Sequence, residues 1–228
     1  MKKKKQRKNK KISKFFKIFD YRIFGYEFIK ITGGLPIIIY LRLKKLYVNK
    51  KIKSFLNHKP YLIAANHSGY LDIMIVANAF WRRRLRFIAT KDVFNTKVKT
   101  KLFTMFGCIK VDKENVSMET FKKITDTLNR GHCVPIFPEG TIIKNDELID
   151  YKSGVILMSF ISKCPIVPMY IVKREKWYQR QKVVIGDIFD VSKYTESKVP
   201  SMEEIKRLTV ILHDIEIDLK NKFEEGKL

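Results

Sequence analysis

Short apolar runs alternate with amphipathic stretches over most of the chain. Apolar-rich runs of strand length occur near residues 61–65, 86–90, 108–111, 133–137, 166–172 and 182–186. Helical patterns lie between them, near residues 72–82, 97–105, 117–130 and 153–162. Because strands that alternate with helices build layered sheets, this order predicts an α/β fold with a mixed, largely parallel central sheet flanked by helices.

A last helix is predicted after residue 200. Ser201 followed by Glu204 is typical of a capping box, in which each side chain bonds the other residue's backbone N–H. Apolar residues then recur at helical spacing: Ile205, Leu208, Ile211, Leu212, Ile215 and Leu219. We interpret this helix as structural packing.

Two segments before residue 49 mix apolar with basic residues. Residues 12–31 and 35–48 are separated by Thr32-Gly33-Gly34, and Pro36 suits a first helical turn. We therefore predict an amphipathic helical hairpin whose first helix lies at a membrane surface. The alternative is a helix packed on the domain with a solvated basic face. The unbroken apolar run 35–41 is far shorter than the roughly 20 residues that span a bilayer, so we expect the hairpin to lie on the membrane.

These patterns divide the chain into three parts. Residues 1–11 are nearly all basic or amide residues and predict a disordered tail. Residues 12–48 form the predicted membrane-associating hairpin, and residues 49–228 the α/β domain. No apolar leader with a cleavage site follows the tail, so we expect a peripheral, monotopic protein on the cytoplasmic face of the cell membrane.

The charge balance indicates an anionic partner. The chain has 47 Lys and Arg against 23 Asp and Glu, a net charge of +24. An acidic membrane surface, an acidic carrier protein, a phosphorylated substrate and nucleic acid all suit such a charge. A basic nucleic-acid-binding protein is therefore the non-enzyme alternative. No recognisable nucleic-acid-binding motif accompanies the charge, and we expect no nucleic acid partner.

The cysteines and histidines show no metal-binding spacing. Cys108, Cys133 and Cys164 are far apart and form no Cys-x-x-Cys pair, so we expect reduced core thiols. The four histidines do not complete a zinc pattern with them. We expect neither a metal nor a cofactor.

His67 and Asp72 are the first candidates for chemistry. Five residues correspond to about 140° around a helix, so these two cannot share a helical face and need a turn to meet. Asn66-His67-Ser68-Gly69 suits a turn, and Asp72 stands where the next helix should begin. A carboxylate there can accept the imidazole N–H and leave the other ring nitrogen as a general base. The alternative is that Asp72 only caps the helix and His67 is structural.

A second candidate segment is Phe137-Pro138-Glu139-Gly140-Thr141, directly after a predicted strand. Backbone N–H groups and a hydroxyl exposed there can meet a phosphate or a polar headgroup. A plain Pro-Glu-Gly turn is the alternative interpretation.

Both segments belong to a longer series of motifs along the chain. It is completed by Lys91-Asp92-Val93-Phe94, Gly107 to Lys113, Tyr151-Lys152-Ser153-Gly154 and Pro165 to Pro168. Together these segments resemble the glycerolipid acyltransferase family, most closely the bacterial 1-acyl-sn-glycerol-3-phosphate acyltransferases, over roughly residues 35 to 190.

The chain departs from the family pattern in two places. Lys113 stands where the family's second block ends in arginine, which keeps the charge and loses the bidentate fork. Ile142 and Ile143 follow Thr141, where the family often carries arginine or serine. These departures put the identity of the acceptor headgroup in doubt.

The resemblance implies acyl transfer from a thioester, acyl-CoA or acyl carrier protein, to the sn-2 hydroxyl of the lysophospholipid 1-acyl-glycerol 3-phosphate, which makes phosphatidic acid. His67 would deprotonate the hydroxyl and Asp72 would orient it, an effect of about 10²–10⁴ in rate. No acyl-enzyme is needed, although Ser68 could in principle form one. The alternatives are a different lysophospholipid, glycerol 3-phosphate or an unrelated alcohol as acceptor.

The resemblance also nominates further site residues. Lys91 would act near the oxyanion and Lys113 on the acceptor phosphate. Asn66 would bind substrate, and the acceptor-binding loop would consist of Glu139, Gly140 and Thr141. In a chain so rich in lysine, either lysine could instead be a solvated surface residue.

Trp81-Arg82-Arg83-Arg84-Leu85-Arg86 is the densest basic cluster inside the domain. It suits an acidic carrier protein, the phosphates of coenzyme A or the bilayer, and it equally suits a solvated loop. Composition does not choose among these interpretations.

Overall fold

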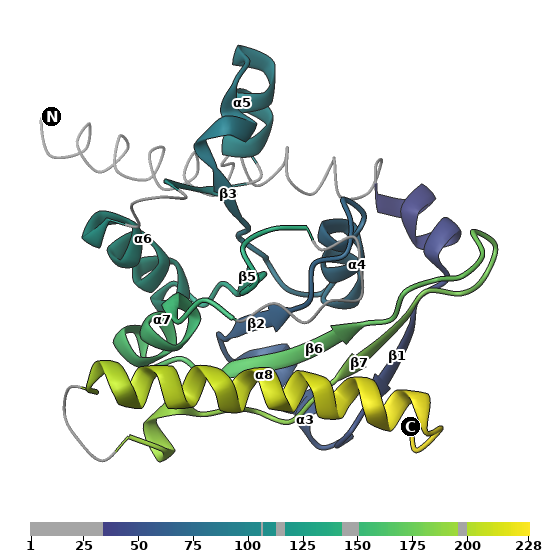
Figure 1. Cartoon of the computed structure of the whole chain (residues 1–228). Helices are drawn as coiled ribbons and strands as arrows, with labels where there is room; N and C mark the ends of the chain where they lie inside the picture. Colours follow the sequence, from purple (N-terminus) through teal and green to yellow (C-terminus); the bar gives the residue numbers. More distant parts are fainter. Residues whose placement is uncertain (1–33, 106, 113–116, 143–150, 196–199) are drawn as a thin grey trace, which may run out of the picture.

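The main sheet has five strands in the order β1, β7, β6, β2, β5 (Figure 1). The computed structural model describes residues 34–105, 107–112, 117–142, 151–195 and 200–228. The strands are β1 (Lys44–Tyr47), β2 (Leu62–Ala65), β5 (Val134–Ile136), β6 (Ile166–Ile171) and β7 (Lys182–Ile185). β2 pairs in parallel with β5 and β6, β1 pairs in parallel with β7, and only β6 and β7 are antiparallel. The predicted mixed, largely parallel sheet is confirmed.

A short parallel pair extends the sheet beyond β5. It consists of β3 (Ile88–Thr90) and β4 (Ile109–Val111). Leu85, just before β3, forms a parallel bridge with Cys133, just before β5. Each of the strands predicted from the apolar runs is therefore present, with ends that differ by at most two residues.

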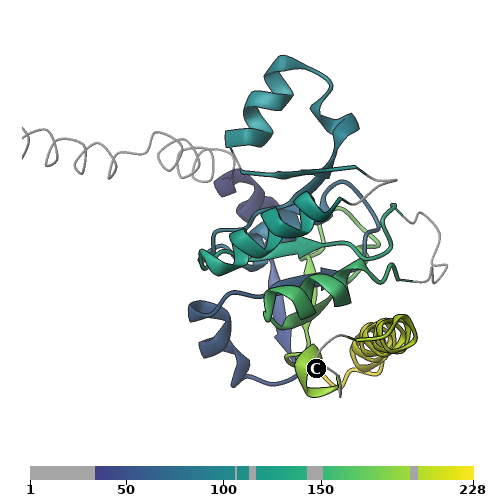
Figure 2. The same cartoon turned by 90° about the vertical axis from the view of Figure 1, so that its left-hand side faces the viewer.

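The central strand β2 has a core on each face because successive side chains point to opposite sides. Leu62 and Ala64 pack into one core, and Ile63 and Ala65 into the other. The first core lies under α6 (Met118–Asn129), α7 (Gly154–Ser162) and α8 (Met202–Glu224). The second lies under α3 (Ile52–His58), α4 (Asp72–Ala79) and the helical residues 34–41. Figure 2 shows the sheet between these helix layers, with α5 (Lys97–Met105) projecting from one end.

The last helix forms as predicted. The Ser201 side chain accepts the N–H of Glu204, and the Glu204 carboxylate accepts the N–H of Ser201. The predicted apolar stripe faces the sheet, with Ile205, Leu208, Leu212 and Leu219 buried. This helix also buries Glu216, which the apolar pattern does not explain.

The prediction of a helix over residues 35–48 is wrong in its second half. Residues 34–41 are helical, but Arg42 takes a positive φ of 43°, which ends the helix. Lys44–Tyr47 then form β1 and pair with Lys182–Ile185 of β7. The boundary drawn at residue 48 consequently cuts off a strand of the sheet. Helix α3, which sequence reasoning missed, follows directly.

The predicted tail over residues 1–11 and the first hairpin helix lie outside the described residues. Within the described part of the chain, no helix combines the length and apolarity needed to cross a bilayer.

Glu216 generates a testable prediction. Its Oε2 has no hydrogen-bond partner among the described residues. Burial raises the pKa of its carboxyl well above the usual value, and the charge of Glu139 raises it further. The folded chain therefore holds this proton more tightly than the unfolded chain, so stability falls as pH rises above the usual glutamate range towards the raised pKa.

We expect Glu216→Gln to have a higher midpoint of thermal unfolding than the unchanged chain at pH 8. At pH 4, where both states of the unchanged chain are largely protonated at this carboxyl, the two midpoints should converge. Calorimetry at both pH values measures this. A difference that stays constant with pH would contradict a buried, protonated Glu216.

Candidate active site

Two loops meet at one edge of the sheet. β2 and β5 are neighbouring parallel strands, so residues 66–71 and residues 137–141 both emerge at their carboxyl ends. Ligands of open α/β sheets bind at this edge. The two segments singled out from the sequence are therefore adjacent in space.

Asp72 holds His67 in the way the sequence predicts. The carboxylate oxygen Oδ2 lies 3.1 Å from Nδ1 of His67. The same oxygen accepts the backbone N–H groups of Ser68 at 2.6 Å and Gly69 at 2.7 Å. Asp72 is the first residue of α4 and only 3% exposed. With Nδ1 donating to the carboxylate, Nε2 is the ring nitrogen that can accept a proton from a substrate.

The second loop holds His67 from another side. Oε2 of Glu139 accepts the backbone N–H of His67 at 2.9 Å. The Phe137 ring stacks on the imidazole, with the centroids 4.2 Å apart and the planes 18° apart. Burial raises the pKa of the Glu139 carboxyl, the nearby charge of Asp72 adds to this, and the His67 N–H opposes it. Glu139 therefore joins the two loops, a role that the sequence did not indicate.

The Asn66 side chain bonds to the backbone at the end of β6. Its Nδ2 donates to the Ile171 carbonyl at 3.1 Å, and its Oδ1 accepts the Ile171 N–H at 2.7 Å. Both ends of the amide are engaged with the end of β6. The Asn66 side chain therefore fixes the direction in which the chain leaves β2 and so positions His67, while substrate binding by Asn66 stays a prediction.

Gly140 makes the sharp turn of the second loop. Its φ is +70°, a conformation that side chains other than glycine rarely adopt, and its N–H donates to the Phe137 carbonyl at 3.0 Å. A Cβ at this position would lie 2.8 Å from Cε and 2.9 Å from Nζ of Lys152. Thr141 follows, exposed to solvent.

Lys152 contacts the second loop, and sequence reasoning gave it no role. Its backbone N–H donates to the Pro138 carbonyl at 2.9 Å, and its ammonium lies against Gly140. A signal was present in the sequence, because Lys152 belongs to the Tyr151-Lys152-Ser153-Gly154 segment that completes the family order.

The other two predicted lysines are placed differently. Lys91 lies in the short helix η1 (Lys91–Phe94) after β3, and its Nζ donates to Asp112. Both partners are exposed, with side chains 59% and 38% accessible. Lys113 lies outside the described residues.

Comparison with known proteins gives one family. Residues 47–172 match a family model described as Acyltransferase. The chain is 28% identical over 156 residues to a Mycoplasma genitalium protein named probable 1-acyl-sn-glycerol-3-phosphate acyltransferase, covering 64% of this chain and 56% of that protein. It is 24% identical over 170 residues to the Bacillus subtilis 1-acyl-sn-glycerol-3-phosphate acyltransferase, covering 72% and 83%. The match thus spans little more than half of the Mycoplasma genitalium protein.

The fold also occurs in a solved structure. The crystal structure of the 1-acyl-sn-glycerophosphate (LPA) acyltransferase PlsC from Thermotoga maritima superposes with a TM-score of 0.59 at 15% identity. The alignment covers 88% of this chain and 80% of that one. At this identity the likeness bears on the fold alone.

Gly140→Ala tests the geometry of the second loop. We expect a loss of about 1–2 kcal/mol in the free energy of unfolding, because a Cβ in the left-handed region is strained. Gly69→Ala is the matched control, since a Cβ there meets no atom within 4 Å and the backbone is not left-handed. Urea denaturation compares the two. Equal losses would contradict the turn described here.

Proposed function

This chain belongs to the acyltransferase family, and from that premise we propose that it transfers a fatty acyl group from acyl-CoA or acyl carrier protein to the sn-2 hydroxyl of 1-acyl-glycerol 3-phosphate. The product is phosphatidic acid, an intermediate of phospholipid biosynthesis. The observation that carries the proposal is the His67–Asp72 contact, at the sheet edge where the two motif loops meet.

The mechanism follows from the orientation of the imidazole. Nε2 of His67 takes the proton of the acceptor hydroxyl as its oxygen attacks the thioester carbonyl. The tetrahedral intermediate then expels the thiolate, and the imidazolium returns the proton to it. Asp72 stabilises the imidazolium and holds the tautomer. A rate effect of about 10²–10⁴ corresponds to roughly 3–5 kcal/mol of barrier.

Direct transfer, without an acyl-enzyme, is supported by the position of Ser68. Its Oγ lies 3.5 Å from Oδ2 of Asp72. The hydroxyl of a nucleophilic serine must be hydrogen-bonded to the base that activates it. The Ser68 hydroxyl is instead beside the carboxylate that orients the base.

The second loop is the place for the acceptor phosphate. Thr141 is exposed there, and Lys152, whose ammonium lies against Gly140, supplies a cation that Ile142 does not. Lys113 remains a proposed second cation. Lys91 remains our proposal for the oxyanion, which requires it to leave Asp112. An exposed ion pair is worth about 0–1 kcal/mol, so a bound substrate can redirect Lys91.

A lipid acceptor also accounts for the surface beside the catalytic pair. Four large apolar side chains just before α4 and in its first turn are exposed: Tyr70 (86%), Leu71 (48%), Ile73 (39%) and Met74 (44%). Exposed apolar patches mark membrane or ligand contacts. We propose that the protein works as a peripheral protein at an anionic membrane surface on the cytoplasmic face, with this patch towards the lipid.

A different acceptor is the second candidate, favoured by Ile142, which stands where the family often carries arginine or serine. Another lysophospholipid or a neutral alcohol would need less positive charge at this loop. An assay of one acyl donor against a panel of such acceptors decides between them.

His67→Ala should lower acyl transfer by about 10²–10⁴-fold, because the general base is lost. The variant should keep the thermal unfolding midpoint of the unchanged chain within a few degrees. Transfer of a radiolabelled acyl group to 1-acyl-glycerol 3-phosphate measures the loss. Activity above a tenth of the original in the folded variant would refute the mechanism.

Lys152→Gln should raise the KM for 1-acyl-glycerol 3-phosphate about tenfold, the effect of removing one charge-assisted phosphate contact. It should leave the KM for the acyl donor unchanged, and Lys152→Arg should restore most of the loss. The exposed Lys122→Gln is the control for charge alone. An equal rise in both KM values would argue against a phosphate contact at Lys152.

A further inference from the structure

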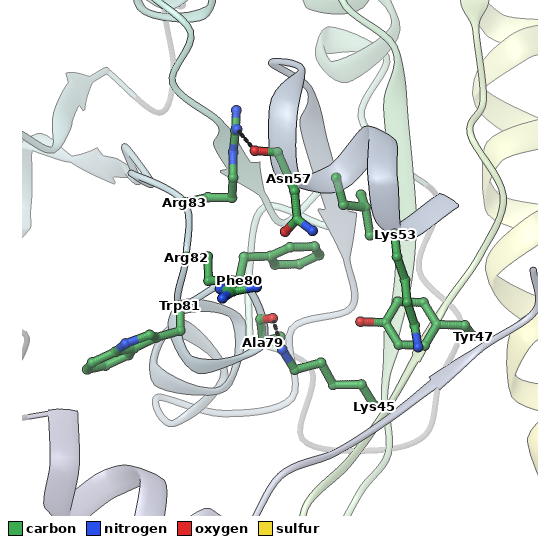
Figure 3. A pocket seen from close by; sticks show the side chains of 10 residues that line it. Lys45, Tyr47, Lys53, Asn57, Ala79, Phe80, Trp81, Arg82 and Arg83 are labelled. Atoms are coloured by element: carbon green, nitrogen blue, oxygen red, sulfur yellow. Dashed lines mark hydrogen bonds between the residues drawn. The ribbon is translucent and has the colours of Figure 1, made fainter. Parts of the chain in front are cut away.

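A hollow lies away from the catalytic loops. It has a volume of about 410 Å³ and is bounded by β1, α3 and the segment that follows α4 (Figure 3). Four of its ten lining residues are cations, Lys45, Lys53, Arg82 and Arg83, and none is acidic. Tyr47 and Phe80 supply aromatic walls, while the Trp81 ring turns away.

The hollow is separate from the candidate active site. Asp72 begins α4, whereas Ala79 ends it and lines the hollow. An eight-residue helix is about 12 Å long, so the two sites lie at opposite ends of α4. A ligand can therefore occupy the hollow without touching His67.

The four cationic side chains of the hollow differ in their hydrogen bonding. Arg83 is engaged with the backbone: its guanidinium donates to the carbonyls of Asn57 at 2.6 Å, Lys59 at 2.8 Å and Gly131 at 3.1 Å. Nζ of Lys45 donates to the Ala79 carbonyl at 2.6 Å and thereby covers the negative end of α4. Arg83 and Lys45 therefore form part of the lining of the hollow and are already bonded to backbone carbonyls.

Lys53 and Arg82 are exposed and available to a ligand. Nζ of Lys53 lies 4.7 Å from the centre of the Tyr47 ring. Burial lowers the pKa of Lys45, and the charges of Arg82 and Lys53 lower it further. The hollow thus gathers like charges that repel one another, and no lining carboxylate offsets them. An anion would relieve this repulsion.

We propose that this hollow is a phosphate-binding site, in which Arg82 and Lys53 bind a phosphomonoester or diphosphate group and Phe80 and Tyr47 contact the part of the ligand next to it. Arginine suits the geometry of phosphate oxygens, and lysine adds a mobile point charge. The site gives the basic cluster after residue 80 a specific partner. It goes beyond acyl transfer and does not depend on it.

The test is calorimetric titration of the full chain with pyrophosphate. Lys53→Gln/Arg82→Gln should weaken the binding about tenfold or more, as expected from the loss of two charge-assisted contacts. Lys122→Gln/Arg130→Gln removes the same charge from two exposed positions at α6 and should leave the affinity within about twofold. His67→Ala and Lys152→Gln, at the catalytic loops, should also retain it. Equal weakening in both double variants, or none in Lys53→Gln/Arg82→Gln, would overturn the proposal.

Competition identifies the source of the phosphate. If coenzyme A displaces pyrophosphate from the unchanged chain and this displacement is lost in Lys53→Gln/Arg82→Gln, the site is assigned to the acyl donor. Displacement by phosphatidylglycerol vesicles and not by coenzyme A assigns it to a lipid headgroup. Displacement by neither leaves a site for free phosphate groups. Because none of these measurements follows acyl transfer, failure of the catalytic proposal would not alter their outcome.

Discussion

One buried carboxylate oxygen organises the catalytic end of the molecule. Oδ2 of Asp72 accepts N–H groups from the His67 ring, Ser68 and Gly69. A buried carboxylate is costly to desolvate unless hydrogen bonds compensate it, so the loop must fold around this atom. The oxygen thereby closes the turn after β2, joins it to the first turn of α4 and sets the direction of the imidazole. Structure and chemistry depend on the same three contacts.

The sheet supplies the rest of the geometry. β2 lies between β5 and β6, and each neighbour holds part of the loop that carries His67. Glu139, after β5, accepts the His67 N–H, and Ile171, at the end of β6, pairs with the Asn66 amide. The histidine is therefore fixed on both sides by elements far apart in sequence. Such support allows a side chain on a loop to keep the orientation that catalysis needs.

The sequence predicted the parts of this arrangement that arise from local patterns. Apolar runs located the strands around the site, and the spacing of His67 and Asp72 required the turn that the structure contains. It did not predict β1, because Lys44–Tyr47 mixes lysine with apolar residues and becomes a strand only by pairing with β7. Nor could it place the Asn66 amide, whose partner is 105 residues away. The basic hollow likewise exists only once β1 and α3 stand beside the end of α4.

We infer that Asp72 holds the His67 imidazole in a single tautomer. Nitrogen-15 NMR of the histidine rings tests it directly, with the His67 signals assigned through their absence in His67→Ala. We expect neutral His67 to carry its proton on Nδ1, to leave Nε2 unprotonated, and to lose this preference in Asp72→Ala. A proton on Nε2, or rapid averaging between the two nitrogens in the unchanged chain, would contradict it.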